Sequence, residues 1–113
     1  MQAGVARGTT FRYELSKKAE VFFFLDRAVP GRLVEGHCHR ATRHNRHHRR
    51  CARYVRSGSF KQAGIQGANA KPFSGRIGTL KLAPARYRVK LVAVDDMGNP
   101  SSSKPVLRFT IVR

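Results

Sequence analysis

The stretch LAPARYRVKLVAVDDMGNPSS, residues 82–102, decides which fold class the chain belongs to. Within it, apolar and basic side chains alternate at every second position. The apolar set is Tyr87, Val89, Leu91 and Ala93, and the basic set is Arg86, Arg88 and Lys90. Alternation with a period of two is typical of a β-strand that buries one face. Gly98-Asn99 follows, a pair that can supply the positive φ of a hairpin turn. The stretch therefore predicts a strand and a turn that leads into a second strand.

The same period of two continues through the rest of the chain. Residues 11–15 and 107–111 alternate in the same way, and residues 20–26 are apolar on both faces, as a central strand of a sandwich would be. Turn-forming residues separate these runs, at Val29-Pro30-Gly31, in the glycine-rich residues 64–69 and at Ser74-Gly75. No window of a dozen residues carries a helical stripe. About seven short strands with turns between them predict an all-β fold, an antiparallel β-sandwich.

Two motifs in residues 82–102 sharpen this prediction. LAPARY ends a loop with Pro84 and places Tyr87 at the first inward position of the next strand. Its hydroxyl can bond the backbone of the preceding loop, which is the tyrosine corner of Greek-key sandwiches. With the following A-x-D-x-x-G-N-x-S, residues 93–101, the region resembles the C-terminal half of bacterial immunoglobulin-like and fibronectin type III-like modules of the actinobacterial type. Ala85 stands where that family usually has glycine.

The resemblance extends from about Gly8 to the C-terminus and implies several further expectations. Residues 1–8 would be a linker, and residues 9–113 would form an immunoglobulin-like Greek-key module whose first hairpin spans residues 8–32. Such modules occur in exported multidomain proteins. The resemblance therefore implies an extracellular or cell-surface location, neighbouring domains in a longer chain, a monomeric isolated module and a spacer or adhesion role.

Composition limits the partners that the protein can attract. Twenty-three basic residues against six acidic ones give a formal charge of +17, and 113 residues with 41% hydrophobic content suit one folded domain. Such a charge favours polyanionic partners, including anionic wall polymers, glycans and nucleic acid. The excess of arginine over lysine favours bidentate contacts, although a coding bias towards arginine would produce it too. No apolar leader is visible and the longest apolar run, residues 21–25, is too short to span a membrane. We therefore expect either an intracellular protein or one module of a longer exported chain.

The most basic segment is CHRATRHNRHHRRC, residues 38–51, which is bracketed by the two cysteines. A zinc site would recruit Cys38, Cys51 and two of the segment's histidines, but the spacing matches no zinc finger. A disulfide between two strands joined as a hairpin is the favoured interpretation, and it would stabilise the fold by about 3 kcal/mol in an oxidising compartment. Two free thiols remain the alternative in the cytosol.

The residues between the cysteines are candidates for binding polyanions by charge. They are Arg40, Arg43, His44, Arg46, His47, His48, Arg49 and Arg50, with His39 adding charge at low pH. A variable surface loop without a ligand is the plainer interpretation.

The alternative function is that of a small basic nucleic-acid-binding protein. It finds less support, because no helix is available for a groove and Tyr13, Tyr87 and Phe109 would face inward. Tyr54 is the one aromatic residue near the basic segment that could be exposed.

Catalysis has little basis in the sequence. Asp95-Asp96 precede Gly98-Asn99, where an Asx turn explains them better than a calcium site does. Serine, histidine and aspartate are present without a nucleophile elbow. We therefore expect no enzymatic activity, no metal and no cofactor.

Overall fold

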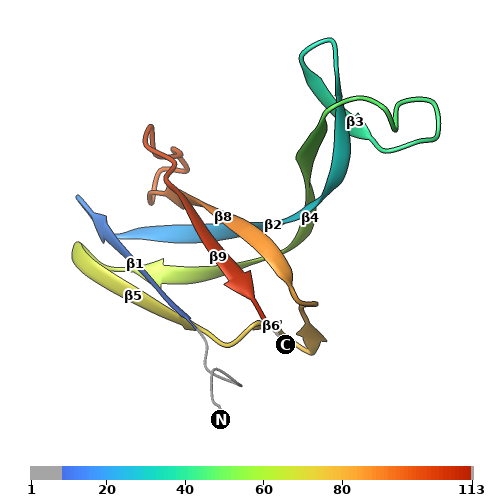
Figure 1. The fold of residues 1–113 in the computed structure, drawn as a ribbon. Helices are drawn as coiled ribbons and strands as arrows, with labels where there is room; N and C mark the ends of the chain where they lie inside the picture. Colours follow the sequence, from blue (N-terminus) through green and yellow to red (C-terminus); the bar gives the residue numbers. More distant parts are fainter. Residues whose placement is uncertain (1–8, 113) are drawn as a thin grey trace.

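A computed structural model describes residues 9–112, in which the chain forms strands and turns and no helix (Figure 1). The expected linker, residues 1–8, lies outside the described residues. Seven strands have four or more residues, and a further pair, β6 (Arg76–Ile77) and β7 (Leu80–Lys81), has two residues each. The longer strands are β1 (Thr9–Leu15), β2 (Ala19–Val34), β3 (His37–Arg40), β4 (Arg50–Gly64), β5 (Gly67–Phe73), β8 (Ala85–Val94) and β9 (Val106–Ile111). All pairs of neighbouring strands are antiparallel, so the all-β prediction is confirmed.

Two sheets pack face to face around an aromatic core. The larger sheet has the order β4-β2-β8-β9, with β3 paired to the far end of β2, and the smaller one is β1-β5. The ring centroids of Phe11 on β1 and Phe23 on β2 are 6.0 Å apart, and those of Phe60 on β4 and Phe73 on β5 are 5.6 Å apart. The buried cluster contains Phe11, Val21, Phe23, Leu25, Phe73, Leu82, Tyr87, Val89 and Leu91. Burial of these apolar side chains is the main force that holds the two sheets together.

The expected first hairpin, over residues 8–32, is wrong. β1 pairs with β5, from Thr9 opposite Phe73 to Leu15 opposite Gly67, whereas β2 pairs with β4 and β8. The turn at residues 16–18 therefore carries the chain from one sheet to the other. The reason is packing, since Phe11 and Tyr13 bury their rings against Phe23 across the sandwich rather than beside it.

The expected turn at Val29-Pro30-Gly31 is also wrong, because β2 runs without interruption from Ala19 to Val34. Its pairing with β8 ends at Arg27 and its pairing with β3 begins at Gly31. Pro30 therefore lies where β2 has a partner strand on one side only, a position that tolerates proline in a sheet. The turn comes later, at Glu35 and Gly36, which have φ of 52° and 79°. β4 likewise runs without interruption, from Arg50 to Gly64.

The end of the sandwich near Tyr87 has the contacts that the motif led us to expect. Tyr87 is 2% exposed, its hydroxyl donates to the carbonyl of Ala83 over 2.7 Å, and its ring stacks on Phe109 at 5.4 Å. Burial raises the pKa of the Tyr87 phenol. At the next turn, Gly98 has a φ of 83° and Asp95 forms an Asx turn by accepting bonds from the Met97 and Asn99 amides.

Candidate polyanion-binding arm

The basic segment lies on an arm that projects away from the sandwich (Figure 1). We define the arm as residues 28–55, which comprise the far half of β2, all of β3, the following loop and the near half of β4. It separates because β8 stops pairing with β2 at Arg27, while β4 continues alongside β2 as far as Arg32. A β-bulge lies at the same level, where Leu25 and Asp26 of β2 face Gly58 and Arg56 and leave Ser57 as the extra residue. A bulge bends and twists its strand, so it helps to redirect the arm.

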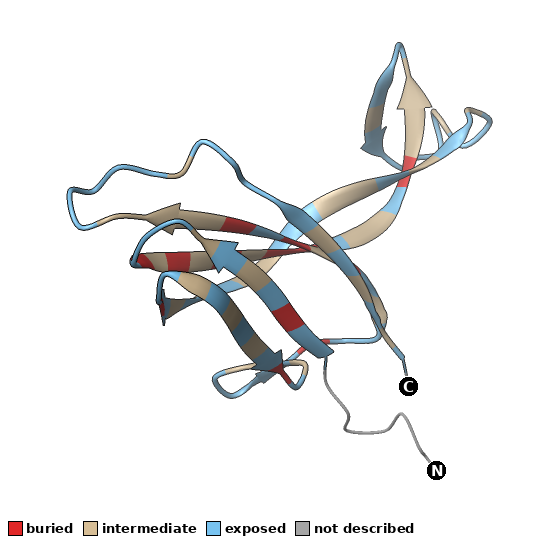
Figure 2. Ribbon diagram, turned by 90° about the vertical axis from the view of Figure 1, so that its left-hand side faces the viewer, coloured by how far each residue is buried: buried red, intermediate tan, exposed pale blue. Residues whose placement is uncertain are grey.

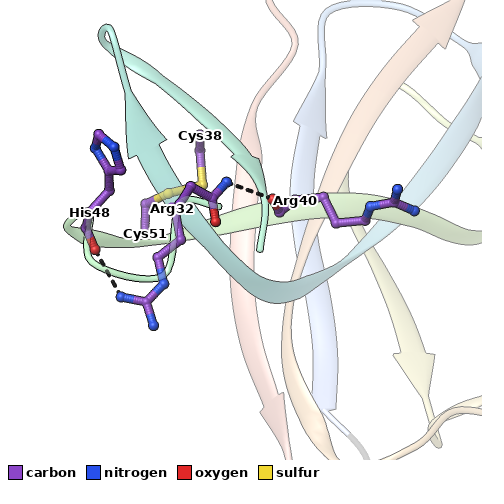
Figure 3. The surroundings of a disulfide bond; sticks show 6 residues. Arg32, Cys38, Arg40, His48 and Cys51 are labelled. Carbon is purple, nitrogen blue, oxygen red and sulfur yellow. Dashed lines mark hydrogen bonds between the residues drawn. A yellow bond between two sulfur atoms is a disulfide. The ribbon is translucent and has the colours of Figure 1, made fainter. Parts of the chain in front are cut away.

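A disulfide between Cys38 and Cys51 closes the arm, which confirms the favoured interpretation of the two cysteines (Figure 3). Both sulfur atoms are bonded to each other, so neither thiolate is available for the zinc site that we considered. The Cα atoms are 6.0 Å apart. The two strands do not form the expected hairpin with each other, however. β3 and β4 each pair with β2, with Cys38 opposite Leu33 and Cys51 opposite Gly31.

The absence of a side chain at Gly31 makes this arrangement possible. A Cβ atom there would lie 2.6 Å from the Cys38 Sγ, 2.7 Å from the His39 carbonyl oxygen and 3.0 Å from the Cγ of Arg53. The disulfide therefore passes over Gly31, from the strand on one side of β2 to the strand on the other. Gly31 is needed for this close approach rather than for a turn.

The loop between β3 and β4 is held by a set of local hydrogen bonds that centre on Asn45. Its side chain accepts from the Thr42 amide at 2.8 Å and donates to the Arg40 carbonyl at 3.0 Å, while its backbone carbonyl accepts from the His48 amide. Arg32, which lies on the neighbouring strand β2, donates a hydrogen bond of 2.8 Å to the His48 carbonyl (Figure 3). Asn45 was not among the predicted residues, although asparagine's preference for local backbone bonds in turns could have indicated it.

These bonds leave the charged side chains of the loop pointing to solvent. The exposed candidates are Arg40, Arg43, His44, Arg46, His47, Arg49, Arg50 and also His39. His48 is half-buried, with its ring centroid 4.5 Å from that of His47. The structure therefore brings all predicted polyanion-binding residues together in one part of the arm, residues 39–50, which we call the lobe.

The arm carries a strong and unneutralised positive charge. It contains seven arginines and all five histidines of the chain, against a single acidic residue, Glu35. Among residues 9–112, none of the four salt bridges includes a residue of the arm. No apolar side chain of the arm belongs to the buried core, and Figure 2 shows the arm almost without buried positions. Its shape therefore depends on backbone pairing, the disulfide and the loop hydrogen bonds.

A buried carboxylate fixes the base of the arm. Asp26 is 7% exposed and accepts hydrogen bonds from Nε of Arg56 at 2.7 Å and Nε of Arg88 at 3.2 Å. Burial by itself would raise the pKa of Asp26, but the two arginines outweigh it and hold that pKa below its usual value. Asp26 thus joins β2, β4 and β8 where the arm leaves the sandwich. In the sequence, Asp26 ends the expected apolar strand of residues 20–26, and no partner was predicted for it.

A hollow of about 590 Å³ lies on the other side of the molecule, between β1 and the strands β8 and β9. Leu15, Leu91, Ala93 and Leu107 line it together with Ser101 and other polar residues of the loop before β9. Asp95, one of its lining residues, accepts hydrogen bonds from the Asn99 amide and, at 3.0 Å, from Lys17, and these bonds hold its pKa at about 2. The described lining includes no histidine or cysteine.

No helix in the described part of the chain is long and apolar enough to cross a membrane. No family model, curated protein or solved structure matches this chain.

Proposed function

We propose that the protein is a non-catalytic β-sandwich module that docks anionic polymers, such as anionic wall polymers or acidic glycans, through its arm. The observation that carries this proposal is the lobe of exposed arginines and histidines whose only acidic neighbour in the arm is Glu35. Such a lobe attracts a polyanion by charge and releases counterions as the charges pair. Arginine suits this task because its guanidinium stays charged and binds phosphate or carboxylate in a bidentate manner.

The disulfide and the resemblance to exported modules support a place outside the cell. Disulfides persist in oxidising compartments and are rare in the cytosol. We infer that the module is extracellular or attached to the cell surface, belongs to a longer chain of the immunoglobulin-like or fibronectin type III-like kind, and acts as a spacer or adhesion unit. In this role the sandwich positions the arm, and the arm makes the contact.

The test compares two variants that lose the same charge from different places. In the arm variant, Arg43, Arg46, Arg49 and Arg50 are replaced by glutamine. In the control variant, four exposed residues of the sandwich that take part in no salt bridge within residues 9–112 are replaced in the same way: Arg12, Arg76, Lys81 and Arg86. Both variants carry a formal charge of +13, since 17 − 4 = 13.

Binding to heparin and to duplex DNA is measured at several salt concentrations. For DNA, log K falls linearly with log salt. This slope should be less steep by about 3.6 in the arm variant if all four arginines pair with phosphates, at about 0.9 for each. The control variant should keep most of the slope. Equal losses in both variants would mean that the whole surface attracts polyanions and that the arm has no special part.

A further inference from the structure

The larger sheet has a second basic surface on the side that faces away from β1 and β5. We call it the outer face. On β2, Phe22 and Phe24 point to this side because they alternate with the buried Val21, Phe23 and Leu25. The register places Phe22 between Lys61 and Val92, and Phe24 between Ser59 and Lys90. Its aromatic residues are Phe22, Phe24 and Tyr54, and its basic residues are Arg56, Lys61, Arg88, Lys90 and Arg108.

Aromatic rings and guanidinium groups are arranged in layers on this face. The rings of Phe22 and Phe24 are nearly parallel, at 12°, with centroids 6.3 Å apart. The Arg56 guanidinium lies 4.8 Å from the Phe24 centroid, and that of Arg88 lies 4.1 Å from the Tyr54 centroid. Both arginines are bonded to Asp26, so their positions are already fixed before a ligand arrives. Preorganised groups lose less conformational entropy on binding.

The charge of the outer face is positive. Two acidic residues lie next to it, and both are paired with basic ones. Asp26 is buried beneath Arg56 and Arg88, and the Glu20 carboxylate forms a salt bridge of 3.5 Å with Lys61. Lys90 and Arg108 take part in no salt bridge among residues 9–112. A ligand that complements this face has negative charge along its length and flat groups that can stack on aromatic and guanidinium planes.

Single-stranded nucleic acid has this combination of properties. Its phosphates pair with basic grooves, while its unpaired bases stack on aromatic side chains and on arginine planes. A duplex hides its bases within the helix, and a sulfated glycan has no aromatic group. We propose that single-stranded nucleic acid binds the outer face, with bases stacked on Phe22 and on the layers formed by Arg56 over Phe24 and Arg88 over Tyr54.

This inference deepens the proposed polyanion-docking function, on which it rests. The outer face and the arm are continuous. Tyr54 belongs to both, and Arg56 of the outer face is the first residue of β4 after the arm ends. A single-stranded nucleic acid bound along the arm can therefore extend onto the outer face. The arm would supply attraction for any polyanion, and the outer face would select one with exposed bases.

The experiment measures binding of the full, oxidised chain to three probes: a labelled oligothymidylate of about 12 nucleotides, within the usual site size, a DNA duplex of the same length, and heparin. The test variant is Phe22→Leu with Phe24→Leu, which keeps both residues apolar and the charge unchanged but removes both rings. Its affinity for the single strand should fall by at least about five-fold through loss of the stack on Phe22, the lower end of a base–aromatic stack, and further because Arg56 loses the ring beneath it. Its affinity for the duplex and for heparin should stay unchanged. The arm variant described above should weaken binding of all three.

The wild-type protein provides a second measurement that does not depend on the variant folding. In two-dimensional NMR spectra, the oligothymidylate should shift the amide signals of Phe22, Phe24 and Lys90, whereas heparin should shift mainly those of the arm. Unchanged single-strand affinity in the leucine variant, or oligothymidylate shifts confined to the arm, would overturn the inference and leave the arm proposal intact. A parallel loss of heparin binding in the leucine variant would overturn it in favour of an acidic glycan on the same face.

Discussion

Removal of the disulfide, by Cys38→Ser together with Cys51→Ser, should unfold the arm and leave the sandwich folded. The two cysteines are 13 residues apart in the sequence. In the chain-entropy model, a bridge over a loop of this size stabilises the folded state by about 3 kcal/mol. The bridge is the only covalent constraint on an arm that contributes no apolar side chain to the described core. We therefore expect its loss to act locally.

The local character of the effect limits its size in a global unfolding experiment. Without the bridge, a sandwich with a frayed arm becomes an alternative folded state. The free energy of global unfolding then falls by about 3 kcal/mol at most, and by less if the arm's own stability in the bridged protein is smaller. The measurement combines denaturant unfolding with native-state hydrogen exchange, which reports the stability of each segment separately.

The expected pattern is loss of amide protection in β3, in residues 28–34 and in residues 50–55, while Phe23, Leu25 and Val89 keep theirs. The wild-type protein treated with a thiol reductant is the matched control and should show the same pattern. Equal loss of protection in the arm and at Val89 would refute the reasoning, because it would show that the two parts unfold together. Full protection of the arm without the bridge would refute it as well, since backbone pairing alone would then suffice.

Three further predictions follow from individual contacts. Tyr87→Phe removes the bond to the Ala83 carbonyl and should lower the free energy of unfolding by about 1 kcal/mol; a denaturation midpoint equal to that of the wild type would contradict this. Gly31→Ala places a Cβ atom against the disulfide and should hinder its formation, so thiol labelling of the purified variant should rise above the wild-type level; no rise would mean that the arm shifts to make room. Asp95 has a pKa of about 2, held down first by the Asn99 amide and then by Lys17. The ionised carboxylate therefore stabilises the fold at pH values above 3.8, its ordinary pKa, and this contribution disappears as the pH falls towards 2. Stability measured across this range should depend less on pH in Asp95→Asn, and an unchanged dependence would assign the effect to other groups.

Local pattern was enough to predict the sandwich, because each strand carries its own alternation. Tyr87, Val89 and Leu91 face one way whatever lies opposite them, and this period of two requires a half-buried strand. The contact of Tyr87 with Ala83 is also local, since only four residues separate the two. The Cys38–Cys51 bridge belongs to the same class, because two cysteines at the ends of a short segment have few other partners within reach.

The arrangement of the strands and the details of both candidate surfaces depended on contacts between distant residues. Whether Pro30-Gly31 forms a turn depends on where β8 stops, and the sequence around Pro30 holds no information about residue 87. β1 pairs with β5 because Phe11 packs against Phe23 of the facing sheet and against Phe73 of β5, and Phe73 lies more than fifty residues away along the chain. Asp26 acquires its two arginines from β4 and β8, and Phe22 and Phe24 form the centre of an outer face only when Lys61 and Lys90 lie beside them. Such pairings depend on register across the sheet, and the energies that select a register come from packing of the whole core rather than from any one segment.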